Sequence, residues 1–171
     1  TMVPVDHAMA KVDGVFNGVR LEGDFVGPVM LTGYGAGMNA TASAVMGDVI
    51  AVARNLAAGT AVRSPSMGCP QKSLAGYPIK PMDEIVSAYY LRFTVQDCPG
   101  VLSKIAGVLG NNQISIESMI QPHRHEAEAV PIVLMTHEAM ERNVRQALDE
   151  IDCFELVREK SLMVRIEDNL H

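Results

Sequence analysis

The clearest pattern along the chain is an alternation of apolar and polar positions that changes to a helical period near residue 97. Leu91, Phe93 and Val95 fall on one face of an extended segment, and the residues between them fall on the other. This period-two spacing is typical of a half-buried strand. Beyond residue 100, apolar residues recur at helical spacing, at Val101, Leu102, Ile105, Ala106 and Leu109. The pattern therefore predicts a strand that ends near residue 96 and a helix that follows directly.

The rest of the C-terminal half extends this pattern to six elements. Residues 114–120 alternate as a second strand, and residues 130–135 are apolar enough for a central strand. Apolar positions between residues 140 and 151 mark a second helix, and a strand follows around residues 154–157. The order strand, helix, strand, strand, helix, strand predicts an α+β, ferredoxin-like fold with two helices on one face of an antiparallel sheet. Residues 162–166 also alternate, and the sequence leaves open whether they join this sheet or the N-terminal part.

The junction of the first strand and helix carries the candidate chemistry of this half. It reads Asp97-Cys-Pro-Gly-Val-Leu102. Asp97 can cap the helix, Pro99 suits its first turn, and Gly100 leaves room for a close approach to the backbone. The unpaired amides of a helix N-terminus favour a carboxylate or another anion. A plain strand-to-helix turn with no ligand explains the same residues.

This turn, set in the predicted order of elements, resembles the ACT domain, a small amino-acid-sensing regulatory module. The resemblance implies that the domain binds an amino acid, most plausibly L-threonine, where two ACT modules pair as a homodimer. The amides of Gly100, Val101 and Leu102 would then hold the α-carboxylate, and Asp97 the α-ammonium. Ser115, expected beside the turn, would meet a hydroxyl group. Alternatively, Asp97 only caps the helix and Ser115 only faces solvent.

In the N-terminal part, the residue pattern predicts two strands, at residues 15–21 and 29–31, followed by a glycine-rich loop and a helix. The helix has an apolar stripe between residues 42 and 56, with Asn39 or Thr41 as its cap and Gly59 as its end. The loop fails the dinucleotide fingerprint because its third glycine would fall at Met38. It also lacks the Lys-Ser/Thr pair of a phosphate-binding loop. The loop is therefore weak evidence of a site when taken alone.

Residues 33–45 read Gly-Tyr-Gly-Ala-Gly-Met-Asn-Ala-Thr-Ala-Ser-Ala-Val, and Asp48 follows. This run resembles the end of the catalytic region of homoserine dehydrogenase, although Tyr34 and Ala40 stand where that family usually has proline. The resemblance implies NAD(P)-linked interconversion of aspartate semialdehyde and homoserine. It places Gly35, Ala36 and Gly37 beside the cofactor.

In longer members of that family a linker and an ACT domain follow, which is the order seen here. We expect the chain to be a piece of a longer protein, with the nucleotide-binding domain and the substrate-handling lysine and acidic residues before Thr1. No catalytic residue is assigned within the chain. The chain alone is expected to bind no cofactor and to be inactive, with NADP or NAD serving the full-length enzyme. A free-standing amino-acid sensor that acts on another protein is the alternative.

The resulting organisation has four parts. Residues 1–62 are the remnant of the catalytic region, and residues 63–86 are a linker rich in proline and glycine. Residues 87–160 are the ACT domain, and residues 161–171 form a C-terminal strand and tail.

Composition and charge narrow the function classes. The 171 residues are 48% hydrophobic and 20% charged, with a formal net charge of −6 and no basic cluster. This argues against a nucleic-acid or membrane surface, including the single-stranded RNA binding known for the same topology. Three widely spaced cysteines fit a reducing cytoplasm. His123, His125, Glu126 and Glu128 do not have a recognisable metal-ligand spacing, so a solvated loop is predicted there.

Overall fold

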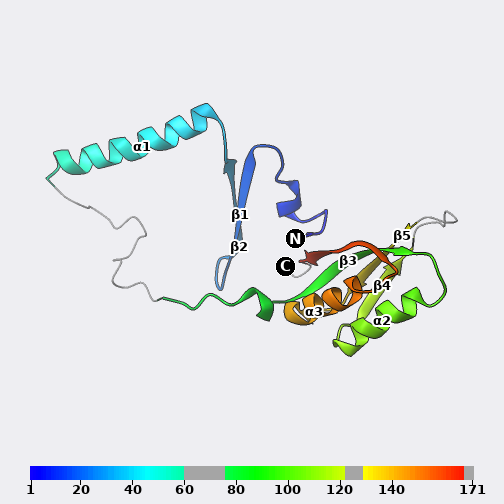
Figure 1. The fold of residues 1–171 in the computed structure, drawn as a ribbon. Coiled ribbons are helices and arrows are strands. Elements are labelled where there is room, and N and C mark those ends of the chain that lie inside the picture. The colour runs from blue at the N-terminus through cyan, green and yellow to red at the C-terminus, as the bar shows by residue number, and fades with distance from the viewer. Residues whose placement is uncertain (60–75, 122–128, 168–171) are drawn as a thin grey trace. The chain divides into compact units, whose positions relative to one another are not determined.

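The computed structural model describes residues 1–59, 76–121 and 129–167. The chain divides into two compact units. Unit 1 comprises Thr1–Pro4 and Ile79–His171, and unit 2 comprises Val5–Pro78. Figure 1 shows the helices and strands of both units. None of the helices in the described ranges is long and apolar enough to cross a membrane.

Unit 1 is an antiparallel sheet with helices on one face, as the sequence predicts. Its strands pair in the order β4-β5-β3-β7, and the short β6 pairs with the start of β3. Figure 1 shows α2 and α3 together on one side of the sheet. In chain order the elements are η3 (Met82–Glu84), β3 (Val86–Gln96), α2 (Val101–Asn111), β4 (Ile116–Ile120), β5 (Ala129–Thr136), β6 (Ala139–Met140), α3 (Glu141–Asp152) and β7 (Val157–Ile166).

The core of unit 1 lies between the sheet and the two helices. Leu91, Phe93 and Val95 of β3 are fully buried, as the alternation predicts. Ile105 and Leu109 of α2 are buried against the same cluster, which α3 completes. Burying such side chains contributes about 1.5–3 kcal/mol each. This core gives unit 1 a stable frame for its surface sites.

The last strand differs from the expectation of two short segments. β7 is continuous from Val157 to Ile166 and pairs with β3, so it crosses residue 160. The open question about residues 162–166 is thus answered in favour of this sheet. The continuous strand could not be recognised in the sequence, because the polar residues Arg158–Lys160 interrupt its apolar alternation. They are tolerated because this end of the strand is exposed to solvent.

The first residues of the chain add to the outer edge of β7. Met2 forms a parallel bridge with Ile166. The Met2 amide donates to the Arg165 carbonyl at 2.7 Å, and the Glu167 amide donates to the Met2 carbonyl at 2.9 Å. Unit 2 is therefore an insertion between two segments of unit 1. A bridge of one residue is too short to show an apolar periodicity, so it could not be predicted from the sequence.

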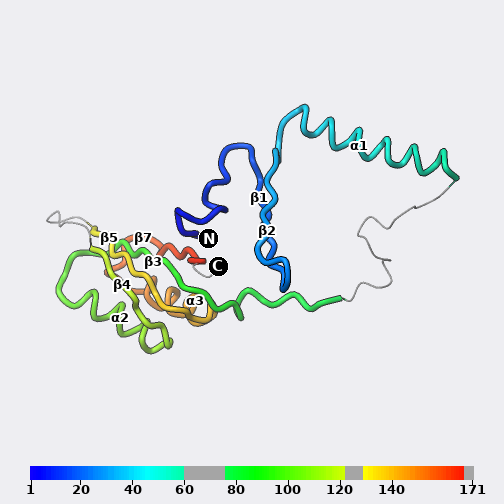
Figure 2. Tube along the Cα trace, turned by 180° about the vertical axis from the view of Figure 1, so that it is seen from behind, coloured from blue at the N-terminus to red at the C-terminus, as the bar shows by residue number. Residues whose placement is uncertain are grey.

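Unit 2 contains a hairpin and one long helix. It begins with η1 (Ala8–Lys11), continues with β1 (Phe16–Gly23) and β2 (Gly27–Tyr34), and ends with α1 (Met38–Ala57). Figure 2 shows the hairpin and α1 from behind. The rings of Phe16 and Tyr34 stack at 4.5 Å between centroids across the two strands.

The two ends of α1 test the predicted cap and the predicted end of this helix. Asn39 and Thr41 are not the cap, because the helix already begins at Met38 with Gly37 as its N-cap and no side-chain capping bond. Gly37 has a φ of 126°, which an L-residue rarely adopts, so the glycine sets the helix start. Gly59, at φ 66°, follows the last turn as predicted, and its amide donates to the Leu56 carbonyl.

Candidate functional site

The turn between β3 and α2 is the first candidate site, and a glycine shapes it. Gly100 has a φ of 89° and is the N-cap of α2. The Lys104 amide donates to the Gly100 carbonyl at 3.1 Å, which begins the helical hydrogen bonding. Leu102 and Ser103 lie in the first turn, where a backbone amide has no acceptor within its own helix. The turn therefore presents amide donors at the positive end of a helix dipole.

Two capping predictions at this turn are wrong. Asp97 is not the N-cap of α2, because Gly100 holds that position. Pro99 precedes the N-cap, so it does not occupy the first helical turn. The left-handed conformation of Gly100 moves the helix start beyond both residues. The Val101 amide already donates a long hydrogen bond, of 3.4 Å, to the Cys98 carbonyl. It is therefore less available to bind a ligand than an amide that has no acceptor.

Ser115 lies at the other end of the sheet from this turn, so the expectation that it sits beside Asp97 is wrong. β4 and β3 both run antiparallel to β5, so they are parallel to each other. β4 therefore begins where β3 begins, and the Ser115 carbonyl accepts a hydrogen bond from His137 just past β5. Ser115 lies roughly level with Tyr89, and Asp97 is roughly 26 Å further along β3 at about 3.3 Å per residue.

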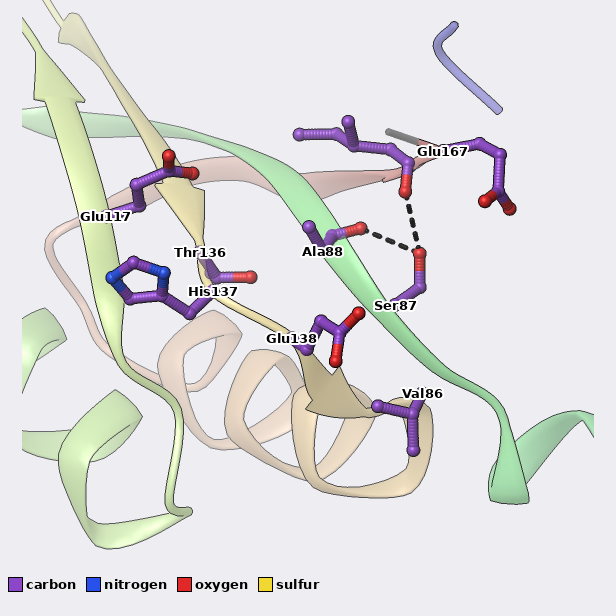
Figure 3. Close-up of a pocket in the computed structure, with 9 residues that line it drawn as sticks. Val86, Ser87, Ala88, Glu117, Thr136, His137, Glu138 and Glu167 are labelled. Carbon is purple, nitrogen blue, oxygen red and sulfur yellow. Dashed lines mark hydrogen bonds between the residues drawn. The ribbon is translucent and has the colours of Figure 1, made fainter. Parts of the chain in front are cut away.

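A cavity of about 230 Å³ lies at this opposite end of the sheet (Figure 3). Three carboxylates, from Glu117, Glu138 and Glu167, line it together with His137. The Ser87 hydroxyl donates to the Ile166 carbonyl at 2.9 Å in its wall. Sequence reasoning missed this cavity because its residues come from separate strands with no shared spacing. In the described part of the chain, no group of His, Cys, Asp and Glu residues is arranged to hold a metal ion.

A buried carboxylate organises the helix side of unit 1. Glu141, the first residue of α3, is fully buried. Arg165 of β7 donates to it at 2.5 and 2.6 Å, and Arg145 donates to it at 2.6 and 3.0 Å. Burial raises the pKa of Glu141, but the hydrogen bonds and charges of the two arginines outweigh it, so this pKa lies below its usual 4.5.

Tyr89 completes this network. Its hydroxyl donates to the Glu141 carboxylate at 3.5 Å. Burial, and then the negative charge of Glu141, raises the pKa of the Tyr89 phenol above 10.0. The network therefore joins β3, α3 and β7 through satisfied charges. We interpret it as structural because Glu141 does not line the cavity at the end of the sheet.

The glycine loop in unit 2 is held by close packing. The Gly35 amide donates to the Val15 carbonyl at 2.9 Å. A Cβ atom on Gly35 would lie 2.0 Å from the Asn17 side chain, so any other residue here would have to displace that side chain. Gly37 needs its positive φ to start α1, and Ala36 stands between the two glycines. These contacts explain the glycines without a ligand, and they leave the predicted cofactor role of Gly35, Ala36 and Gly37 as a prediction.

Comparison with protein families assigns both parts of the chain. Residues 1–50 match the model "Homoserine dehydrogenase", and residues 89–152 match the model "ACT domain". The two models match separate parts of the chain, which do not overlap. Both families recognised in the sequence are thereby confirmed, in the order expected for a homoserine dehydrogenase that carries an ACT domain.

Individual homoserine dehydrogenases match nearly the whole chain. The enzyme of Neisseria gonorrhoeae is 39% identical over 100% of this chain, and that of Pseudomonas aeruginosa is 36% identical over 98%. A crystal structure of a homoserine dehydrogenase from Thiobacillus denitrificans matches 98% of this chain with a TM-score of 0.82 and 39% identity. The chain spans 39% of the length of the first two relatives and 38% of the third.

Some sequence predictions fall outside the described residues. His123, His125, Glu126 and Glu128 lie there, so the solvated loop stays a prediction. Cys69 also lies there, whereas Cys98 and Cys153 are free thiols.

Proposed function

We propose that this chain is the C-terminal part of a homoserine dehydrogenase. The complete enzyme would interconvert L-aspartate semialdehyde and L-homoserine with NADP or NAD in the cytoplasm, for threonine and methionine biosynthesis. The observation that carries the proposal is the pair of family matches in tandem, in a chain that resembles a solved homoserine dehydrogenase along 98% of its length. Hydride transfer and proton transfer are assigned to the part of the relatives that this chain does not match.

Unit 2 would form one wall of the catalytic region. Helix α1 has only two charged residues, Asp48 and Arg54, and none of its residues is buried within the chain. An apolar stripe that the chain itself leaves unburied is typical of a helix that packs against another part of the protein. This argues for a helix that packs inside a larger catalytic region, with Gly35, Ala36 and Gly37 facing the cofactor. A free-standing sensor would have no use for such a helix.

Unit 1 would bind L-threonine at the turn before α2. The amides of Gly100 and Leu102 would hold the α-carboxylate, with a smaller contribution from the Val101 amide. The Asp97 carboxylate would pair with the α-ammonium. Because Ser115 lies at the far end of the same sheet, it can meet the threonine hydroxyl only where a second protomer brings it to the turn.

A homodimer of ACT domains supplies such a second protomer. Within the described residues β4 pairs with β5 only, so its other edge is open. Its side chains Met119 and Ile120 are 45% and 54% exposed. An open apolar edge strand favours pairing with another copy.

Isothermal titration with L-threonine tests the effector role, with sedimentation of the chain before and after. We expect threonine-selective, saturable heat from a dimer, with L-isoleucine, L-methionine and L-serine as comparisons. Asp97→Asn should weaken threonine binding about tenfold, the scale of a charge-assisted hydrogen bond. Asp149→Asn, at an exposed carboxylate of α3, is the matched control and should bind as the parent does. Equal binding by both variants would contradict the role of Asp97.

A complementation assay tests the catalytic part of the proposal. The chain alone should not reduce NAD(P)⁺ with L-homoserine. Co-expression with the N-terminal 61% of the Neisseria gonorrhoeae relative, the share this chain does not match (100% − 39%), should restore activity that threonine modulates. Activity of the chain by itself would refute the inactive remnant, and threonine binding without any complementation would favour the free-standing sensor.

A further inference from the structure

The side chain of Asn17 lies beside the glycine loop of unit 2. Asn17 is the second residue of β1, and its Cα atom pairs with that of Gly33 in β2. A Cβ atom on Gly35 would collide with all three heavy atoms of the Asn17 carboxamide. A Cβ atom on Gly33, in contrast, would meet no described atom within 4 Å. The carboxamide therefore takes the place of a side chain at residue 35 and has open space beside it at Gly33.

The backbone sets the position of Asn17 relative to this loop. Phe16 pairs with Tyr34 across the hairpin, and their rings stack on the face opposite to Asn17. The Gly35 amide then donates to the Val15 carbonyl at 2.9 Å, which holds the start of the loop against β1. These backbone contacts do not use the Asn17 side chain, so they remain when that side chain is replaced.

The Asn17 carboxamide has no hydrogen-bond partner within the described part of the chain. Its face of the hairpin is otherwise apolar, because strand alternation places Val19, Leu21 and Leu31 there. These three side chains are 54%, 55% and 60% exposed. Such an apolar face indicates burial in the complete protein. Because buried carboxamides are hydrogen-bonded, Asn17 needs a partner from outside the described residues.

We propose that Asn17 binds the carboxamide group of the nicotinamide ring. This inference rests on the proposed function, in which Gly35, Ala36 and Gly37 face the cofactor. An asparagine side chain offers a carbonyl acceptor and an NH₂ donor. The nicotinamide carboxamide offers the same two groups, so the pair forms two parallel hydrogen bonds. Glycine at residue 35 leaves room for the flat ring to approach.

Cofactor titration of the reassembled enzyme tests this contact. The chain is co-expressed with the N-terminal part of the Neisseria gonorrhoeae relative, as in the complementation assay, and the complex is titrated with NAD(P)⁺ in a calorimeter. Asn17→Leu keeps the branched shape of the side chain but removes both polar atoms. It should weaken cofactor binding about tenfold, the effect of two lost hydrogen bonds. Asn111→Leu, at an exposed asparagine of α2, is the matched control and should bind as the parent does.

A cofactor analogue identifies the group that Asn17 meets. The 3-acetylpyridine analogue of NAD(P)⁺ carries a methyl group in place of the carboxamide NH₂. The parent should bind it about fivefold more weakly than NAD(P)⁺, because the Asn17 carbonyl is left without a donor. Asn17→Leu should bind the two compounds within about twofold of each other. Titration measures binding alone, so the different reactivity of the analogue does not affect this ratio.

The outcomes separate this contact from the proposed function. An active parent complex whose Asn17→Leu variant keeps the preference for NAD(P)⁺ over the analogue would overturn the contact alone. Such a variant that binds both compounds more weakly by the same factor would show that Asn17 only packs against the loop. An inactive parent complex would refute the proposed function and this contact with it. Sedimentation verifies that each variant assembles with the N-terminal part.

Discussion

Glu141 shows how one buried charge can hold three elements of unit 1 together. Its carboxylate accepts hydrogen bonds from Arg165, Arg145 and Tyr89. Removing one partner of a buried ion pair costs roughly 3–5 kcal/mol when both groups are buried. In this network the side chains of Arg145 and Arg165 are 54% and 27% exposed, so water can compensate part of the loss.

We therefore expect Glu141→Gln to lower the free energy of unfolding by about 2 kcal/mol in urea titrations. Glu150→Gln, at an exposed position of the same helix, should change it by less than about 0.5 kcal/mol. Because the pKa of Glu141 is lower in the folded state, its contribution is present above about pH 4.5. It is lost as the pH falls through the lowered pKa. Glu141→Gln should remove this part of the acid sensitivity, and an unchanged profile would contradict the assignment.

Replacing a glycine of unit 1 by alanine should have opposite effects on stability at two positions. Gly100 has a φ of 89°, so Gly100→Ala should destabilise unit 1 by about 1–2 kcal/mol through backbone strain. Gly107 lies inside α2, and a Cβ atom there would meet nothing within 4 Å. Gly107→Ala should therefore stabilise unit 1, by up to about 1 kcal/mol. Thermal unfolding of both variants checks the pair, and a destabilised Gly107→Ala would contradict the open space.

At the scale of elements, periodicity predicted the strands and helices of unit 1 but not how their ends meet. The alternation through Leu91, Phe93 and Val95 was enough to place β3 and its buried face, because burial imposes that period. Ser115 was misplaced because strand direction follows from pairing with β5, which no local pattern records. The helix start at Gly100 depended on one left-handed residue, whereas the sequence offered Asp97 and Pro99 as equally plausible signals.

The cavity at the end of the sheet could not be predicted from the sequence, for a related reason. Glu117 lies in β4, whereas His137 directly follows β5 and Glu167 directly follows β7, so no local spacing links the three residues. Only the three-dimensional register brings such residues together. Glycine packing was similarly hidden, since Gly35 is explained by Asn17 on the neighbouring strand.

Helix α1 should be the least protected long element of the chain. No residue in Met38–Ala57 is buried, whereas β3 contains four fully buried side chains. An isolated helix has little stability of its own, since most helical stability in proteins comes from packing. Hydrogen exchange followed by mass spectrometry should therefore show fast exchange in residues 38–57 and slow exchange in residues 89–95. Slow exchange in α1 within the chain alone would contradict this.

At the scale of the whole molecule, each unit has a different degree of independence. Unit 1 buries a core of seventeen hydrophobic residues, while the described hairpin and helix of unit 2 bury none. The match to homoserine dehydrogenase extends across both units, and the chain spans 39% of the length of its Neisseria gonorrhoeae relative. Unit 1 is thus equipped to fold by itself, and unit 2 is suited to a larger assembly.

The bridge between Met2 and Ile166 closes the chain into a ring around unit 2. The entropy lost on closing a ring grows only with the logarithm of its length, so residues can be added to unit 2 at small cost to the bridge. Only two backbone hydrogen bonds hold the Met2 segment to β7, so we expect this bridge to open locally at a lower free energy than the sheet unfolds. Unit 2 can therefore vary in length over evolution while the sheet of unit 1 stays intact. Opening of the bridge would detach the N-terminal end of unit 2 from β7 and leave the same sheet paired.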